Sequence, residues 1–210
     1  LAVMLLIPVY FSTQPMAAGE LRASIIDVGQ GLSVLLQTQH HSLLYDIGAN
    51  TMAGERIITP YLRWSGVSAL DGLMISHNDS DHTGGADALL AQIPIKQAIY
   101  SAAPEGYALP PLTPQHICQA GQHWQWDKVD FTMLSPVLGE HYDKDNNRSC
   151  VLRVSGTGFS LLLTGDMETP AEKILLASAQ NQQLASQILV LGHHGSKTST
   201  SPEFLAAVKP

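Results

Sequence analysis

The chain has 210 residues, of which 45% are hydrophobic, and a formal net charge of −7 at pH 7. This length and composition allow one large hydrophobic core, so we expect a single globular domain. The acidic charge argues against a free nucleic-acid-binding protein, because phosphate contacts normally come from clustered Lys and Arg side chains. Bound divalent metal ions could make the charge locally positive.

The N-terminal segment 1–11 is apolar throughout. A membrane-spanning helix needs about 20 such residues, so we interpret residues 1–19 as the end of a transmembrane helix and its linker. Residues 20–210 would then be a domain of a larger membrane protein. A signal peptide cleaved near the small residues 16–19 is an alternative, although the chain has no initiator Met and no basic region before the apolar run. A buried N-terminal strand is another.

Short apolar runs separated by turn residues predict a series of strands. The predicted strands cover residues 23–28, 33–37, 42–47, 70–76, 97–100, 124–126, 129–134, 150–155, 159–163 and 189–191. Helical spacing or helix-start signals predict helices around residues 57–62, at 86–92, from Thr169 and at 204–208, with a proline-rich loop at 104–114. This order favours two sheets packed face to face with helices outside.

The two cysteines give little information at this stage. Cys118 and Cys150 match neither a Cys-x-x-Cys metal pair nor a disulfide-rich scaffold. We expect two buried thiols, which do not identify a cellular compartment.

The segment between the strand at 70–76 and Gly84 packs four potential metal ligands into six positions, His77, Asp79, Asp81 and His82. His77 and Asp79 can point the same way, while the adjacent Asp81 and His82 must diverge, so the loop can offer one ligand pair to each of two metals. An acidic turn in which Asp81 caps the following helix is the alternative. The density of ligands favours a metal-dependent hydrolase.

Three further segments could complete such a site. Asp166 follows an apolar strand and could bridge two metals, or it could interact with the dipole of the next helix. His193 and His194 also follow a strand, and imidazole is a common zinc ligand. Asn146 could supply an amide oxygen and Arg148 could bind a substrate phosphate, although this segment alone also reads as an ordinary turn.

Other polar and aromatic residues are harder to assign. Asp46 could orient a metal-binding histidine or could be an ordinary turn aspartate. Trp124 and Trp126 alternate along a strand and face the same way, and we interpret them as packing residues rather than as a platform for stacked bases.

Six short motifs occur in order along residues 22–210. They are DVGQG at 27–31, YDIG at 45–48, SHNDSDHTGG at 76–85, NNRS at 146–149, LTGD at 163–166 and HHGSK at 193–197. Together they resemble the metallo-β-lactamase domain of ComEC-type competence proteins, which belong to the machinery that internalises DNA.

The resemblance implies an α/β (α+β) fold, an αββα sandwich of two mixed β-sheets flanked by helices, with two divalent metal ions at one edge. The implied ligands are His77 and Asp79 for the first metal, Asp81, His82 and His194 for the second, and Asp166 as the bridge. Asn146 falls where many superfamily members place a further histidine, and Asp79 stands at the second histidine position of the usual motif. A sandwich of this kind ordinarily continues with another strand, so we expect residues of the domain beyond Pro210.

Asp79 and Asn146 in place of two histidines make the first metal site richer in oxygen, which shifts its preference from zinc towards manganese or magnesium. A weakened or singly occupied first site is the alternative. The implied reaction is in-line attack on phosphorus by a hydroxide that bridges the metals, with Asp81 and Asp166 in the catalytic centre. His193 would contact phosphate or protonate the leaving oxygen, or would only position His194. Ser196 and Lys197 join Arg148 as candidate substrate-binding residues.

The implied function is a phosphodiesterase that degrades the non-transported DNA strand during natural transformation. Its partners would be DNA, the transmembrane channel portion of the same polypeptide and other competence proteins. The domain would lie on the periplasmic or extracellular side of the inner membrane. Two alternatives remain open: another hydrolase of this fold, such as a phosphorylcholine esterase or a lactonase, and a non-catalytic module that guides DNA and retains a degenerate metal site.

Overall fold

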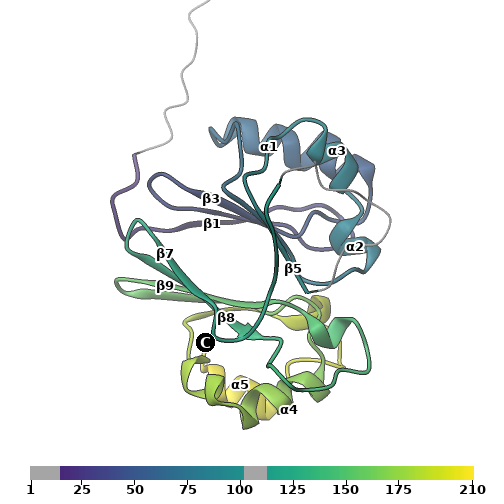
Figure 1. Cartoon of the computed structure of the whole chain (residues 1–210), viewed down its shortest axis with the longest axis vertical. Helices are drawn as coiled ribbons and strands as arrows, with labels where there is room; N and C mark the ends of the chain where they lie inside the picture. The colour runs from purple at the N-terminus through teal and green to yellow at the C-terminus, as the bar shows by residue number, and fades with distance from the viewer. Residues whose placement is uncertain (1–14, 102–112) are drawn as a thin grey trace, which may run out of the picture.

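The computed structural model describes residues 15–101 and 113–210. It confirms the predicted sandwich, in which two mixed sheets face each other and helices cover both outer faces (Figure 1). The first sheet has the strand order β1 (Arg22–Ile25), β2 (Val34–Gln37), β3 (Ser42–Tyr45), β4 (Gly72–Ile75), β5 (Ala98–Tyr100) and β6 (Gln115–Ile117). The second has the order β11 (Ile188–Val190), β10 (Phe159–Leu163), β9 (Val151–Gly156), β8 (Val129–Ser135) and β7 (His123–Trp126).

The helices lie in two layers. The first sheet is covered by a π-helical segment η1 (Ala53–Ile58) that continues into α1 (Thr59–Trp64), and by α3 (Ala86–Leu90). The short helix α2 (Ser80–Thr83) lies in the segment after β4, at the end of the sandwich. The second sheet is covered by α4 (Thr169–Ala177) and α5 (Pro202–Val208) (Figure 1). Short 3-10 turns occur at η2 (Asn146–Arg148), η3 (Ala179–Gln183) and η4 (Gly192–Gly195).

Strand direction brings the ligand-bearing segments to the same end of the sandwich. In the first sheet β3, β4, β5 and β6 run parallel, so their carboxyl ends share one edge. In the second sheet β10 and β11 are parallel and end together, at the pair Leu163 and Val190. The loops that follow β3, β4, β10 and β11 therefore start from neighbouring positions.

Alternation along the strands divides the apolar residues among three cores. In β3, Leu44 packs towards the helices of the first layer, while its neighbours Leu43 and Tyr45 pack between the sheets. On the second sheet, Leu162 joins Leu175 of α4 in a third core under the outer helices. Trp124 and Trp126 flank the central core, and the ring of Trp124 stacks on that of Phe131 with centroids 5.1 Å apart, in agreement with the predicted packing role.

The cysteine prediction is wrong, because Cys118 and Cys150 form a disulfide with an S–S distance of 2.06 Å. Cys118 follows β6 at the edge of the first sheet, and Cys150 immediately precedes β9 in the second. The two residues are 32 positions apart in sequence but meet where the sheets face each other. Spacing alone gives no sign of this long-range contact.

Some local predictions also change. Strand β6 was not predicted, because its three residues are exposed and show no apolar alternation. Thr169 is the first residue of α4 rather than its N-cap. The buried Glu172 does not close a capping box; it accepts hydrogen bonds from the backbone N–H groups of Thr200 and Ser201. Ser201, not Thr200, caps α5.

Two predicted segments fall largely or wholly on residues that the structure does not describe. The end of a transmembrane helix was predicted within residues 1–19, of which 1–14 lie outside the described residues. The proline-rich loop at 104–114 lies almost entirely outside them as well. Within residues 15–101 and 113–210, no helix combines the length and the apolar character needed to cross a bilayer.

Candidate metal centre

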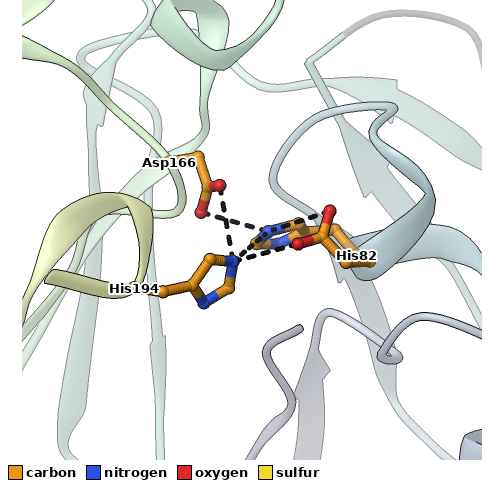
Figure 2. Close-up of side chains that lie close together, drawn as sticks. His82, Asp166 and His194 are labelled. Carbon is orange, nitrogen blue, oxygen red and sulfur yellow. Dashed lines mark hydrogen bonds and ion pairs between the residues drawn. The ribbon is translucent and has the colours of Figure 1, made fainter. Parts of the chain in front are cut away.

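Four of the predicted ligands converge at the shared end of the sandwich. Asp81, His82, Asp166 and His194 each offer one ligand atom, and these atoms all lie within 4.8 Å of one another. His82 Nε2 is 3.0 Å from Asp166 Oδ1 and 3.3 Å from His194 Nε2 (Figure 2). His194 Nε2 is in turn 3.1 Å from Asp81 Oδ2. Two imidazoles and two carboxylates in this arrangement fit a single divalent cation.

Asp46 orients the central histidine of this cluster. Its buried carboxylate accepts hydrogen bonds from the backbone N–H and the hydroxyl of Ser76, and its Oδ2 lies 2.7 Å from His82 Nδ1. With Nδ1 bonded to Asp46, the other ring nitrogen of His82 faces the ligand cluster. The metal-ligating histidines of many proteins are oriented in this way by a carboxylate. Of the two interpretations of Asp46 from the sequence, the structure supports the orienting role.

The charges around His82 determine its protonation when no metal is present. Burial acts to lower the pKa of His82, but Asp46 and Asp166 outweigh that effect and raise the pKa to about 10. For Asp166, burial acts to raise the pKa, whereas the hydrogen bond and the charge of His82 bring it below the usual aspartate value. A proton on His82 thus stands in for a cation among these carboxylates, and metal binding would displace it.

The second predicted pair lies beside this cluster. His77 is fully buried, its ring lies 4.2 Å from that of His82, and its Nε2 has no hydrogen-bond partner in the described structure. That nitrogen is 3.5 Å from Asp79 Oδ2 on the exposed side. Burial, followed by the charge of His82, lowers the pKa of His77, which favours the neutral ring that a metal requires. The arrangement fits a second cation held by nitrogen and oxygen.

Asn146 lies in the turn η2, shortly before β9. The backbone carbonyl of Asn146 accepts hydrogen bonds from the N–H and the hydroxyl of Ser149. The side chain of Asn146 makes no hydrogen bond within residues 15–101 and 113–210. A role for Asn146 as a metal ligand therefore stays a prediction.

Ser149 holds the backbone of Asp166 in place. Its hydroxyl accepts a hydrogen bond from the backbone N–H of Asp166 at 3.1 Å. The preceding Gly165 has a φ of +53°, and a Cβ there would lie 2.7 Å from the Cβ of Ser76 and 2.9 Å from the Ser149 hydroxyl. The close fit of Gly165 between two serines fixes the start of the loop that carries Asp166.

The glycine-rich segment 27–31 packs against the metal-binding loop. The side-chain amide of Gln30 donates to Asp81 Oδ2 at 3.2 Å. A Cβ on Gly31 would lie 1.9 Å from the Asp81 carbonyl oxygen, so only glycine allows this approach. The sequence did not reveal this contact, because Gln30 and Asp81 are 51 residues apart.

His193 and His194 both adopt left-handed backbone conformations, with φ of 49° and 52°. Such conformations are uncommon for residues other than glycine and often occur at functional sites. His193 Nε2 lies 3.8 Å from Asp166 Oδ2, and its Nδ1 lies 3.1 Å from the Thr198 hydroxyl and 3.4 Å from Glu168 Oε1. Thr198 and Glu168 were not singled out from the sequence, since neither belongs to a ligand-like pattern.

The remaining candidates lie on the loop after His194. The Ser196 hydroxyl is 3.1 Å from that of Thr198, so it belongs to the hydrogen-bonded turn beside His193. Lys197 is exposed, with no ion pair within the described part of the chain. Both substrate-binding assignments stay predictions.

The sequence model of the metallo-beta-lactamase superfamily matches residues 26–210. The chain therefore belongs to the metallo-β-lactamase superfamily, as its motifs predicted. A solved metallo-β-lactamase from Hirschia baltica has a TM-score of 0.53 and 16% sequence identity, with 90% of each chain covered. At that identity the likeness shows the fold alone.

Curated relatives are more similar in sequence. The chain is 45% identical over 208 residues to Competence protein ComA of Neisseria gonorrhoeae, with 98% of this chain and 28% of ComA covered. It is 38% identical over 190 residues to Recombination protein 2 of Haemophilus influenzae, with 88% of this chain and 23% of the relative covered. The chain thus spans about a quarter of the length of the relatives it matches.

Proposed function

We propose that this chain is the metal-dependent phosphodiesterase domain of a membrane DNA-uptake protein and that it degrades the non-transported DNA strand. The observation that carries the proposal is the convergence of Asp81, His82, Asp166 and His194 on one point. Similarity to a competence protein and to a recombination protein supports DNA as the substrate.

The ligand sets suggest two cations. His82, His194 and Asp81 would hold one, His77 and Asp79 the other, and Asp166 would contact both. Manganese or zinc fits this mixed nitrogen and oxygen set, and magnesium is an option at the more oxygen-rich pair. When bound, such cations activate water as a nucleophile and neutralise the charge that develops on phosphate oxygens.

The other side chains orient the metal ligands, and one of them donates a proton to the leaving oxygen. Asp46 fixes the ring of His82, and Ser149 fixes the backbone of Asp166. We assign the proton donor for the leaving oxygen to His193, whose Nδ1 is held near Thr198 and Glu168 while Nε2 lies near Asp166. A histidine oriented by a carboxylate on one nitrogen can deliver a proton from the other.

The disulfide supports a location outside the cytoplasm. Disulfides such as that between Cys118 and Cys150 persist in the periplasm and outside the cell, whereas cytosolic thiols are kept reduced. We therefore propose that the domain faces the periplasmic or extracellular side of the inner membrane. There it would meet incoming DNA, next to the channel portion of the same polypeptide and other competence proteins.

The test is a substrate comparison with the purified chain in manganese, magnesium or zinc. We expect cleavage of single- or double-stranded oligonucleotides labelled at each end, with little turnover of phosphorylcholine esters or lactones. Absence of metal-dependent DNA cleavage under all three metals would refute the proposal. Turnover of only an ester or a lactone would assign the chain to another hydrolase of this fold.

A further inference from the structure

A cavity of about 310 Å³ lies beside the metal centre and contains none of the proposed metal ligands. Its wall is formed by the residue after β5, the end of β6 with the two residues that follow, the loop after β8 and the turn η2. The residues used below are Ser101, Ile117, Leu138, Glu140 and Arg148. A volume near 300 Å³ is at the small end of ligand pockets, a size class that suits one nucleotide rather than a longer segment.

Chain connections place the cavity next to the metal centre. Tyr100 of β5 pairs with Ile75 of β4, so Ser101 and Ser76 are the next residues along two neighbouring parallel strands. Ser76 precedes His77 of the metal centre. On the other wall, Arg148 is joined by one peptide bond to Ser149, whose hydroxyl holds the backbone of Asp166.

Two polar side chains of the cavity, Arg148 and Ser101, lack hydrogen-bond partners within residues 15–101 and 113–210. The exposed Arg148 side chain makes no hydrogen bond or ion pair within residues 15–101 and 113–210. The hydroxyl of Ser101 is buried and has no hydrogen-bond partner in that same part of the chain. A guanidinium and a hydroxyl that line one cavity can both donate to phosphate oxygens, and the planar guanidinium can do so with two parallel bonds.

The other walls suit the base and sugar of a nucleotide. Leu138 and Ile117 are 76% and 51% exposed, an unusual exposure for large apolar side chains that share one cavity. A base can lie against such a surface. Glu140 also lines the cavity; its carboxylate would repel phosphate but can accept from the exocyclic amino group of a base.

We infer that this cavity binds one nucleotide of the substrate strand, next to the phosphodiester that is cleaved. The phosphate lies at Arg148 and Ser101, and the base lies against Leu138 and Ile117 on the side of Glu140. This inference rests on the proposed function for its substrate class. It adds a binding subsite that holds the strand in register with the metal centre.

The test compares Arg148→Ala and Leu138→Asp with Arg63→Ala, which removes the same charge from the exposed surface of α1. Leu138 is exposed, so its replacement should not disturb folding. We expect both cavity variants to raise KM for an oligonucleotide about tenfold or more, with a smaller change in kcat, since each removes binding to a part of the strand that does not react. Arg63→Ala should change neither constant. Unchanged KM in both cavity variants would overturn the inference.

A binding measurement separates failure of this inference from failure of the proposed function. The dissociation constant of a fluorescein-labelled, phosphorothioate-linked tetranucleotide is measured by anisotropy in the presence of manganese. Weaker binding by Arg148→Ala than by Arg63→Ala, of about tenfold, would support the subsite even if the wild type cleaved no DNA. Equal affinity of the two variants would overturn the subsite even if the wild type were an active nuclease.

Discussion

Asp46 determines much of the metal-centre geometry although it is not a predicted ligand. Its φ of 59° is in the left-handed region, and its buried carboxylate joins Ser76 to His82. Aspartate and asparagine tolerate this backbone conformation better than most residues, so a change to asparagine alters the charge with little backbone strain.

We predict that Asp46→Asn lowers the affinity for manganese about 10- to 100-fold, because the ring of His82 loses its negatively charged partner. Isothermal titration of the metal-free protein measures this change. Asp87→Asn, at an exposed position on α3, is the matched control and should bind as the wild type does. Equal affinity of Asp46→Asn and the control would show that Asp46 does not support the ligand.

Asp79 is the residue that most distinguishes this ligand set. Its Oδ2 lies 3.5 Å from His77 Nε2, with half of its side chain exposed. Because an imidazole is a softer ligand than a carboxylate, we predict that Asp79→His shifts the preference for zinc over manganese by roughly tenfold. Competition between the two metals, followed by metal analysis, measures the shift. An unchanged ratio would mean that Asp79 contacts no metal.

At the scale of elements, two hairpin turns hold the sheets together away from the metal centre. Asp127, in the turn between β7 and β8, lies 2.7 Å from the hydroxyl of Thr38 and from the backbone N–H of His40, both after β2. It also lies 2.9 Å from His40 Nδ1. Partial burial acts to raise the pKa of Asp127, but the bonds from His40 and Thr38 outweigh it and lower the pKa to about 2.

This lowered pKa gives stability a definite dependence on pH. Because the folded pKa lies below the ordinary value of 3.8, the ionised carboxylate stabilises the fold above about pH 4, and this stabilisation is lost as the pH falls towards 2. We predict that Asp127→Asn lowers the free energy of unfolding at pH 7 by about 1 to 2 kcal/mol and flattens its decline between pH 4 and 2. Urea unfolding measures both, with the highly exposed Asp143→Asn as control. If the free energy of unfolding of Asp127→Asn fell between pH 4 and 2 as steeply as that of the wild type, the lowered pKa of Asp127 would not be the cause of the decline.

Element prediction from the sequence succeeded where side-chain periodicity carries the information. The inner strands β3 and β4 alternate between the first core and the central core, β9 alternates between the central core and the third, and their apolar residues mark all three clearly. The exposed edge strand β6 lacks that signal. The loop after β4 was also singled out, since four potential ligands lie within six residues of the chain, and two of them, Asp81 and His82, belong to the cluster of the structure. Contacts such as that of Gln30 with Asp81 join segments far apart in sequence, and no local pattern encodes them.

At the scale of the whole molecule, the disulfide is a covalent cross-link between the two sheets, in addition to the main chain that joins them. It closes a loop of 32 residues, for which loop-closure entropy gives a stabilisation of roughly 3 to 4 kcal/mol. We predict that the double variant Cys118→Ala, Cys150→Ala loses about this much free energy of unfolding in urea. Thiol reductant should destabilise the wild type but not the double variant. If reductant left the free energy of unfolding of the wild type unchanged, the disulfide would not have this stabilising role.

The central claim is that the converging ligands form a metal-dependent nuclease centre. The direct measurement is the rate of oligonucleotide cleavage by manganese-loaded wild type and Asp166→Asn, with circular dichroism to verify that both are folded. We predict metal-dependent cleavage by the wild type and a cleavage rate about a hundredfold or more lower in the variant. The reason is that Asp166 offers a ligand atom to the same cation as His82 and His194. A folded variant that cleaves DNA as fast as the wild type, or a manganese-loaded wild type that cleaves none, would contradict the claim.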